Sequence, residues 1–369
     1  MMHDQARDGD ATTPLAPSRR LLLRAVPGLP AFAVLAALGQ DEADARRKGR
    51  GRRRSHRPGR RKDNRKGKRK GRGKETCQVC ATGCAFTSVQ AAHDAAQDGD
   101  TLILCGGSYP EAVTIQKNVI LRSRAGEQAK LLGTGSGSVM TVQPGTTVTL
   151  GDGTWISGGT GTLINGVTFG GGVVNYGSLT MTGRSIVTQN TAARGGGIYN
   201  NGTLALSGAE AVVHENTAAA DGGGVYNERG ATFTIDNGQV HRNAATGNGG
   251  GVFSTGMTTF IMQNNAQVVD NTAAQGAGIY STIGIDSPQN LTFTMTDSSV
   301  TGNVASQAGG GIFNDGGPVT LKSSTVFQNT ATIAGGIFNT AGGVISLDSE
   351  SAVLDNDPTN CVGTDACDP

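Results

Sequence analysis

Five side chains that could do chemistry together recur at matched positions: His214, Glu215, His241, Arg242 and Asp270. Each lies one or two residues before the asparagine of a repeated Val-x-x-Asn motif. Imidazole, carboxylate and guanidinium groups serve general acid–base catalysis, and carboxylates also bind calcium. In stacked strands the charged side chains would fall in register about 4.8 Å apart. We favour a structural charge ladder, worth about 0.2–1 kcal/mol per pair, with a ligand or ion site and catalysis as alternatives.

Cysteines form a second set, placed only at the two ends of the folded part. They are Cys77, Cys80, Cys84, Cys105, Cys361 and Cys367. The first four could hold a metal through four thiolates. We favour disulfides, because the N-terminus described below predicts export to an oxidising compartment. The preferred pairs are Cys84–Cys105 and Cys361–Cys367, although spacing alone does not fix connectivity. No cofactor and no metal are expected.

Two landmarks repeat along the chain. The first is Gly-Gly-aliphatic-x-Asn, with Ser in place of Asn in two copies, and successive copies are 25, 27, 27, 27, 33 and 25 residues apart. The second is Val-x-x-Asn, and between the two lies a short segment of alternating apolar and polar residues. The asparagines that end the second landmark are Asn190, Asn216, Asn243, Asn271, Asn303, Asn329 and Asn356.

Three short β segments per repeat, joined by Gly and Asn turns, are typical of one coil of a parallel β-helix. Alternating side chains place one apolar set inside the coil, and stacking on neighbouring coils buries that set. Gly supplies positive φ at the corners, and Asn tolerates the left-handed region. We expect the seven asparagine amides to form a structural ladder of hydrogen bonds along the axis, with the Tyr and Phe residues after Gly-Gly-aliphatic stacked likewise. About ten coils are predicted.

These landmarks resemble the repeats of chlamydial polymorphic membrane proteins, whose motifs are Gly-Gly-Ala-Ile and Phe-x-x-Asn. The copy most similar to them joins Phe327-Gln328-Asn329 to Gly335-Gly336-Ile337. The segment from Phe86 to Glu111 looks like the start of pectin-lyase-like right-handed β-helices. The resemblance covers about residues 86–357, implies an all-β, single right-handed parallel β-helix over 101–357, and is weak for activity. In the chlamydial family the repeats act as surface adhesins.

Enzymes that cleave polysaccharides share this fold, so the resemblance also allows catalysis. Resemblance to polygalacturonases would require the motifs Asn-Thr-Asp, Asp-Asp, Gly-His-Gly and Arg-Ile-Lys, and none occurs in the sequence. The repeats carry Ala, Thr, Gly and Asn where such an enzyme carries acids. We assign no catalytic residue and lean against an enzyme. If the protein is one, a polysaccharide lyase or hydrolase is expected.

The ends of a β-helix need caps, because open strand edges invite aggregation. Within a cysteine-bearing N-terminal cap (75–100), residues 87–97 are expected to form a helix, with Thr87 and Gln90 in a capping-box pattern. The apolar residues Phe86, Val89, Ala92 and Ala96 would close the first coil. Residues 358–369 are a C-terminal tail, which a Cys361–Cys367 disulfide would hold at the other end of the stack.

The longest repeat contains about six extra residues around Ile283–Asn290. This insertion is either a binding loop or the result of neutral drift.

The N-terminus (1–45) resembles a twin-arginine signal peptide. Ser18-Arg19-Arg20-Leu21-Leu22-Leu23-Arg24 is followed by a modestly apolar stretch and by Ala43-Asp44-Ala45, a small-x-small cleavage site. The protein is therefore expected to be exported, to the cell surface or beyond. The longest apolar stretch, Ala31–Gly39, is too short to cross a bilayer, so no transmembrane span is expected in the mature chain.

Charge divides sharply along the chain. Residues 46–74 hold 18 Lys or Arg and one acid, a net +17, whereas residues 75–369 hold 9 bases and 22 acids, a net −13. The basic arm contains no apolar residue, so we expect it to be disordered. It is either a tether to a polyanion or a solvated spacer. It lacks aromatic residues for base stacking, so sequence-specific nucleic-acid binding is not expected.

Three functions remain after these exclusions. We favour an exported, non-catalytic β-helix repeat protein that acts as an adhesin or structural protein at the cell surface. The alternatives are a polysaccharide-binding or polysaccharide-cleaving protein, and a polyanion-binding protein that acts through the basic arm. The expected partner is accordingly a cell-wall polymer, a glycan or another polyanion. A monomer is expected.

Overall fold

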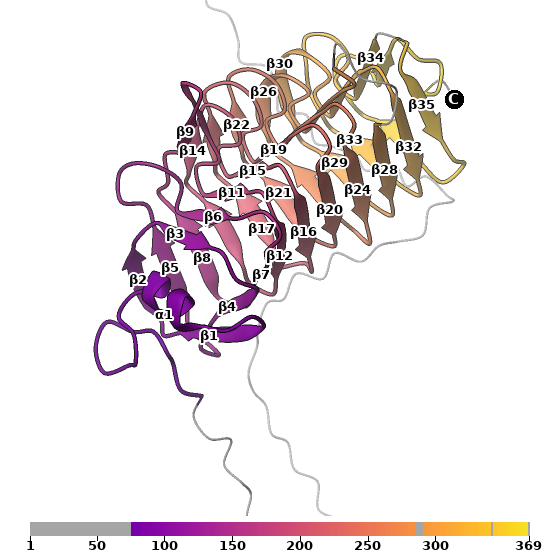
Figure 1. Cartoon of the computed structure of the whole chain (residues 1–369). Coiled ribbons are helices and arrows are strands. Elements are labelled where there is room, and N and C mark those ends of the chain that lie inside the picture. The colour runs from indigo at the N-terminus through magenta and orange to yellow at the C-terminus, as the bar shows by residue number, and fades with distance from the viewer. Residues whose placement is uncertain (1–74, 285–290, 341, 368–369) are drawn as a thin grey trace, which may run out of the picture. The chain divides into compact units, whose positions relative to one another are not determined.

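The structure, a computed structural model, describes residues 75–284, 291–340 and 342–367. The expected signal peptide (1–45) and basic arm (46–74) lie outside the described residues. So does most of the expected insertion around Ile283–Asn290. The described part is a stack of coils (Figure 1).

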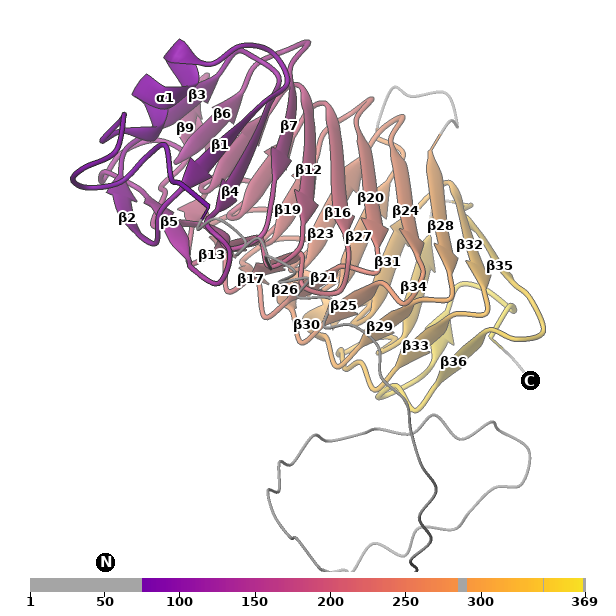
Figure 2. The ribbon, with the colours of Figure 1, turned by 90° about the horizontal axis from the view of Figure 1, so that it is seen from below.

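Three parallel sheets of ten strands each run along the stack. Each coil contributes one strand to each sheet in turn, and equivalent residues of neighbouring coils pair, as Leu204 does with Phe233 and Val213 with Val240. Figures 1 and 2 show these strands side by side from the indigo end to the yellow end. The fold is therefore the right-handed parallel β-helix predicted from the sequence, with about ten coils.

Sheet 1 consists of β1 (Asp100–Leu104), β4 (Val119–Ser123), β7 (Thr147–Leu150), β12 (Ser178–Thr182), β16 (Thr203–Ser207), β20 (Thr232–Asp236), β24 (Thr259–Gln263), β28 (Thr292–Thr296), β32 (Pro318–Lys322) and β35 (Val344–Leu347). Sheet 2 consists of β2 (Gly107–Pro110), β5 (Ala129–Leu132), β8 (Thr154–Ser157), β13 (Ile186–Thr188), β17 (Val212–His214), β21 (Gln239–His241), β25 (Gln267–Val269), β29 (Ser299–Thr301), β33 (Thr325–Phe327) and β36 (Ala352–Leu354). Sheet 3 consists of β3 (Val113–Ile115), β6 (Met140–Val142), β11 (Val173–Asn175), β15 (Ile198–Asn200), β19 (Val225–Asn227), β23 (Val252–Thr255), β27 (Ile279–Thr282), β31 (Ile312–Asp315), β34 (Ile337–Thr340) and β37 (Cys361–Val362).

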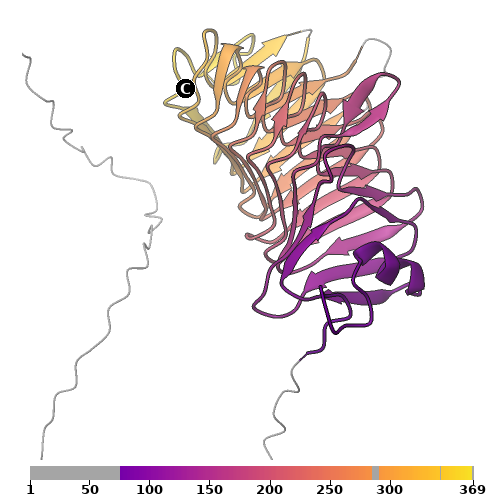
Figure 3. The same ribbon diagram turned by 90° about the vertical axis from the view of Figure 1, so that its left-hand side faces the viewer.

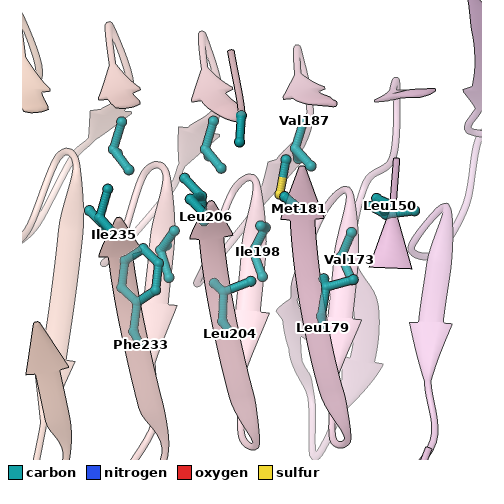
Figure 4. Packing of buried hydrophobic residues seen from close by; sticks show 14 of the residues in the cluster. Leu150, Val173, Leu179, Met181, Val187, Ile198, Leu204, Leu206, Phe233 and Ile235 are labelled. Atoms are coloured by element: carbon teal, nitrogen blue, oxygen red, sulfur yellow. The ribbon is translucent and has the colours of Figure 1, made fainter. Parts of the chain in front are cut away.

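The interior of the coils is the main hydrophobic core. Strands of sheet 1 alternate buried and half-buried residues, so that Leu204 and Leu206 point inward while their neighbours face out. Figure 4 shows such side chains from all three sheets meeting inside the coil. Phe233, Phe260 and Phe293 stack through three successive coils, with ring centroids 5.3 and 4.9 Å apart. Each coil thus buries its apolar set mainly against the coils above and below it.

A second core covers the outward face of sheet 3. The aromatic residues after Gly-Gly-aliphatic stack along this face, as expected, with Tyr226, Phe253 and Tyr280 at centroid distances of 4.8 and 5.2 Å. The segment between sheets 2 and 3 carries a short five-stranded sheet, whose alanines form a separate buried cluster. That sheet consists of β14 (Thr191–Ala192), β18 (Thr217–Ala218), β22 (Ala244–Ala245), β26 (Thr272–Gln275) and β30 (Val304–Ala308), and an antiparallel hairpin of β9 (Thr162–Ile164) and β10 (Val167–Phe169) lies at its first coil.

The asparagines of the Val-x-x-Asn motif are buried and hydrogen-bonded from coil to coil. The Nδ2 of Asn216 donates to Oδ1 of Asn243 at 3.0 Å, and the Nδ2 of Asn243 donates to Oδ1 of Asn271 at 3.1 Å. The positive φ, however, is not at the asparagine. It lies at the residue before it, at +53° for Glu215 and +52° for Arg242. The residue before the asparagine makes the turn of the chain, and the asparagine side chain is buried at that corner.

The asparagines of the Gly-Gly motif form a second ladder that is interrupted. The Nδ2 of Asn175 donates to Oδ1 of Asn200 at 2.7 Å, and the Nδ2 of Asn314 donates to Oδ1 of Asn339 at 2.8 Å. Between these pairs the chain carries serine, and the Oγ of Ser281 is buried with no hydrogen-bond partner among the described residues. The Oδ1 of Asn314, in the next coil, also lacks a partner there.

Ser281→Asn is therefore expected to raise the free energy of unfolding by about 1 kcal/mol. Ser281 pairs in register with Asn314, so the new Nδ2 would donate to the orphaned Oδ1. Urea unfolding followed by circular dichroism measures the change. Ser281→Ala is the control, since alanine supplies no donor. If the alanine variant gains as much as the asparagine variant, the new hydrogen bond is not the cause.

The N-terminal cap contains α1 (Val89–Ala95), shorter than the helix predicted over 87–97. Its N-cap is Ser88, not Thr87, and the capping-box prediction is wrong. The carboxylate of Glu111 accepts hydrogen bonds from the backbone N–H of Val89 at 2.7 Å and of Gln90 at 3.0 Å. Figure 3 shows the helix at the indigo end of the stack. A residue more than twenty positions along the chain thus caps the helix and ties it to the first coil.

The cap also ties its own polar groups to the edge of the stack. The Gln90 side chain accepts from the Thr114 N–H at 2.7 Å and donates to the Thr114 carbonyl at 3.2 Å. His93 is buried, and its Nε2 accepts from the Gln116 N–H at 3.1 Å.

Within the described residues no helix has the length and apolar character needed to span a membrane.

The disulfides correct one prediction. Cys105 pairs with Cys77, not with Cys84, and Cys80 pairs with Cys84. The predicted pairing failed because residues 77–86 form a loop along the edge of β1. In this loop the Gln78 N–H donates to the Ile103 carbonyl, which brings Cys77 to the end of β1. Cys361–Cys367 pairs as predicted, and both residues pack against the last coil of the core.

Candidate functional site

The five residues predicted to gather do come from three neighbouring strands of sheet 2. His214 ends β17 and pairs in register with His241, which ends β21. Their rings lie on the outward face and stack with centroids 5.0 Å apart and planes 13° apart. Glu215 and Arg242 follow these strands and are exposed, as is Asp270 after β25. The sequence therefore placed the two imidazoles correctly side by side.

The three charged residues do not form the expected chain of ion pairs. Among the described residues, the one ion pair in this cluster joins His214 Nδ1 and Glu215 Oε1, 3.7 Å apart. Arg242 and Asp270 lie at left-handed corners whose side chains point to solvent, and neither pairs with the other within 4.0 Å. A row of charges in register thus need not be a row of contacts.

The cluster also lacks the geometry of a metal site. Three His, Cys or carboxylate ligand atoms approach one another within 4.8 Å at two places in the described chain, and both lie where the N-terminal cap meets the first coils. A metal held by imidazole needs several ligand atoms about 2.0–2.2 Å from one centre. Within the described residues, no three ligand atoms of the stacked histidines and the nearby carboxylates come within 4.8 Å of one another.

Burial lowers the pKa of His214 and of His241 below the ordinary histidine value. For His241 the neighbouring His214 and Arg242 lower the pKa further, whereas Glu215 and Asp270 oppose the shift. For His214 the Glu215 carboxylate opposes the shift, and Arg242 adds to it. Both imidazoles are consequently held in the neutral form more strongly than they are in the unfolded chain.

The stability of the fold is expected to fall as the pH drops from about 7.5 to about 5.5. Because the folded pKa values are depressed, the unfolded chain binds more protons over this window, and unfolding is favoured as the pH falls through the unfolded value near 6.5. The double variant His214→Thr with His241→Thr should lose this part of the pH dependence. Threonine already occupies the row at Thr188 and Thr301. Urea unfolding at both pH values tests this, and equal falls in both proteins would contradict it.

The structure also reveals a surface that the sequence reading missed, the outward face of sheet 1. We call it the hydroxyl face and define it by two rows of residues paired in register, one across six coils and one across eight, all half-buried or exposed. The first row is Thr147, Ser178, Thr203, Thr232, Thr259 and Thr292. The second row is Thr149, Thr180, Ala205, Thr234, Ile261, Thr294, Thr320 and Ser346.

The two rows that define the hydroxyl face are regular and uncharged, whereas Asp236 and Lys322 occupy a third outward position on the same sheet. Twelve of its fourteen side chains carry a hydroxyl, and none carries a charge. Within the described part of the chain no protein group hydrogen-bonds to these hydroxyls, so they are available to a ligand. They repeat about 4.8 Å apart between strands and about 6.7 Å apart along a strand. Figure 2 shows the strands that carry them, β7 to β35, in one continuous series.

The signal for this face was present in the sequence. The alternating segments predicted to be strands read Thr-x-Thr, Ser-x-Thr-x-Thr or Thr-x-Ala, with apolar residues between. The apolar residues of these alternating segments locate the core, whereas the polar residues between them form the hydroxyl face. Thr is also favoured in strands for its shape alone, and composition therefore does not distinguish a binding face from a solvated one.

A hollow of about 350 Å³ lies beside the cap, lined by Ser88, Ser108, Tyr109, Glu111 and backbone of the loop at Gly106. The Glu111 carboxylate is occupied by the helix, and it also accepts from Ser88 Oγ at 2.8 Å. Tyr109 Oη donates to the Cys105 carbonyl at 2.7 Å. The polar groups of this hollow hold the cap together, which leaves them without a free acid or base for chemistry.

Comparison with known proteins assigns no family to the chain. No family model matches the chain, and no curated protein matches it. Among solved structures, the chain is similar to the pectin methylesterase from Aspergillus niger in its penultimately deglycosylated form, at 11% sequence identity and a TM-score of 0.41, over 79% of this chain and 91% of that one. The parallel β-helix rests on the chain's own strand pairing, and the likenesses to pectin-lyase-like proteins and to chlamydial repeats stay predictions.

Proposed function

We propose that the protein is an exported, non-catalytic β-helix that attaches to a neutral, repeating extracellular polysaccharide through the hydroxyl face. The observation that carries the proposal is the hydroxyl face itself, two uncharged rows in register over six and eight coils. A polymer that repeats along its length can meet such a face at many equivalent points, and many weak contacts add up to firm attachment.

The chemistry of threonine suits a sugar polymer. Each hydroxyl both donates and accepts hydrogen bonds, as sugar hydroxyls do, and each methyl group offers a small apolar contact to the face of a sugar ring. The described body belongs to a segment of net charge −13. Long-range repulsion would slow the approach of an acidic polymer, which favours a neutral one.

The remaining parts of the proposal rest on separate observations. Three disulfides support an oxidising compartment, in line with the predicted twin-arginine signal. The candidate catalytic cluster supports a non-catalytic role, because Glu215, Arg242 and Asp270 lie at exposed corners and form no ion pair with one another among the described residues.

A pull-down of the full chain with insoluble cellulose and chitin, with polygalacturonate as the acidic comparison, tests the proposal. Wild type should bind a neutral polymer, and Thr180→Lys with Thr234→Lys should weaken binding at least about tenfold, equivalent to about 1.4 kcal/mol. The matched control is Thr301→Lys with Thr325→Lys, the same change on the outward face of sheet 2, which should bind like wild type.

Two outcomes would reject the proposal. Binding that is equally weakened in both double variants would mean that the added charge, and not the hydroxyl face, matters. Binding to polygalacturonate alone, abolished by salt and by deletion of residues 46–74, would identify the basic arm as the active part, because exposed charges are screened by salt. That result would favour the polyanion-binding alternative.

A further inference from the structure

Four cysteine sulphurs gather in the N-terminal cap, away from the hydroxyl face. The Sγ atoms of Cys80, Cys84 and Cys105 lie within 4.8 Å of one another, and Cys77 is bonded to Cys105. Cys105 therefore has all three other sulphurs close by. Cys77 is buried, whereas the other three are half-buried and open to solvent on one side.

This arrangement matches what a zinc ion requires. Zinc bound by four thiolates is tetrahedral with Zn–S bonds of about 2.3 Å, which places the sulphurs roughly 3.8 Å apart. The Sγ atoms of Cys80, Cys84 and Cys105 lie within 4.8 Å of one another, so shifts of roughly one to two ångströms would give this spacing. Cys77 lies outside that group beside Cys105, and it would have to turn toward the other two sulphurs once its disulfide is open. The spacing Cys77-x-x-Cys80 supplies the short ligand pair common in such sites, and the partly open side offers the ion a way in.

The backbone around the cluster is held independently of the sulphurs. The Cys80 N–H donates to the Phe86 carbonyl at 3.1 Å, and the Cys105 N–H donates to the Val79 carbonyl at 2.9 Å. Tyr109 Oη donates to the Val79 carbonyl at 3.1 Å. The four side chains should therefore stay together when their disulfides are open.

We infer that the cap is a two-state site: Cys77, Cys80, Cys84 and Cys105 bind one Zn²⁺ when reduced and form two disulfides when oxidised. Reduction by a dithiol transfers four electrons and four protons to the two disulfides, giving four thiols and two oxidised dithiols. Zn²⁺ then displaces the four thiol protons, and the complex carries a net charge of −2. Zinc affinity consequently rises with pH.

Cobalt binding to the full chain tests the inference. A water-soluble phosphine reduces the protein, taking one oxygen atom from water for each disulfide opened. Anaerobic addition of Co²⁺ should then produce the visible bands of tetrahedral cobalt and a sulphur-to-cobalt charge-transfer band, saturating at one ion per chain. Zn²⁺ should bleach both bands, and the oxidised protein should show neither.

Variants assign the ligands. Cys361→Ser with Cys367→Ser should keep the cobalt spectrum, and Cys80→Ser with Cys84→Ser should lose it. The second variant retains Cys77 and Cys105, so its oxidised form can keep the disulfide that ties the cap to β1, and circular dichroism checks its fold. Cys80→His should restore a tetrahedral spectrum with a weaker charge-transfer band. The inference is overturned if reduced wild type gives no tetrahedral spectrum, or if the spectrum survives in Cys80→Ser with Cys84→Ser.

Discussion

Val268→Asp is expected to unfold the protein or come close to it. Val268 lies in β25, is fully buried, and pairs in register with Val240 and Val300 inside the coil. An aspartate at this position would bury a carboxylate among aliphatic side chains with no cation to pair with it, which costs several kcal/mol even if the group protonates. Circular dichroism and urea unfolding of the purified variant measure the loss.

Thr301→Lys is the control for this prediction. Thr301 lies in the adjacent coil on β29, but its side chain is on the outward face and half-buried. The free energy of unfolding should change by no more than about 0.5 kcal/mol. Equal effects of the two substitutions would contradict the register that assigns Val268 to the interior and Thr301 to the surface.

Asn243→Leu should lower the free energy of unfolding by about 3–5 kcal/mol. The Oδ1 of Asn243 accepts from both the backbone N–H and the Nδ2 of Asn216, and its Nδ2 donates to the Val213 carbonyl and to Oδ1 of Asn271. Leucine has a similar size but leaves all four partner groups buried without that contact. Urea unfolding reports the change.

The neighbouring residue gives the matched comparison. Arg242 is exposed, has φ of +52°, and makes no ion pair among the described residues. Arg242→Asn places a residue that tolerates the left-handed region one position from the ladder, and stability should change little. A loss below about 1 kcal/mol for Asn243→Leu would show that the coil tolerates an open ladder.

The repeating parts of the fold could be predicted from the sequence because each repeat provides the same evidence again. Alternation in segments such as Leu204/Leu206 locates the interior, and the recurring Asn predicts hydrogen bonding along the axis. The position of the left-handed residue was misplaced by one. Asn is the residue known for tolerating the left-handed conformation. Here, however, its side-chain amide has four hydrogen-bond partners in the interior. The residue before the Asn therefore adopts the left-handed conformation.

The parts that occur once were harder to predict. Glu111 caps α1 from the next strand segment, and no local pattern near Ser88 announces a partner so distant in the chain. The pairing of Cys105 depends on how the loop at Gln78 lies along β1, which spacing does not encode. The face formed by Thr180 and Thr234 was visible in the alternation but lacked a chemical marker, because threonine is also an ordinary strand residue.

The equal spacing of the central Gly-Gly motifs has a consequence for how the protein can evolve. Residues Asn200, Asn227, Ser254 and Ser281 follow one another at intervals of 27, and each pairs with the next in register. If one such 27-residue segment is duplicated or removed, the coils at the new junction can pair in the same register as before. The change therefore requires no new type of contact between coils. The length of the stack of coils can therefore change by recombination in steps of about 4.8 Å. It can thus change by whole coils while the pairing register between neighbouring coils is kept.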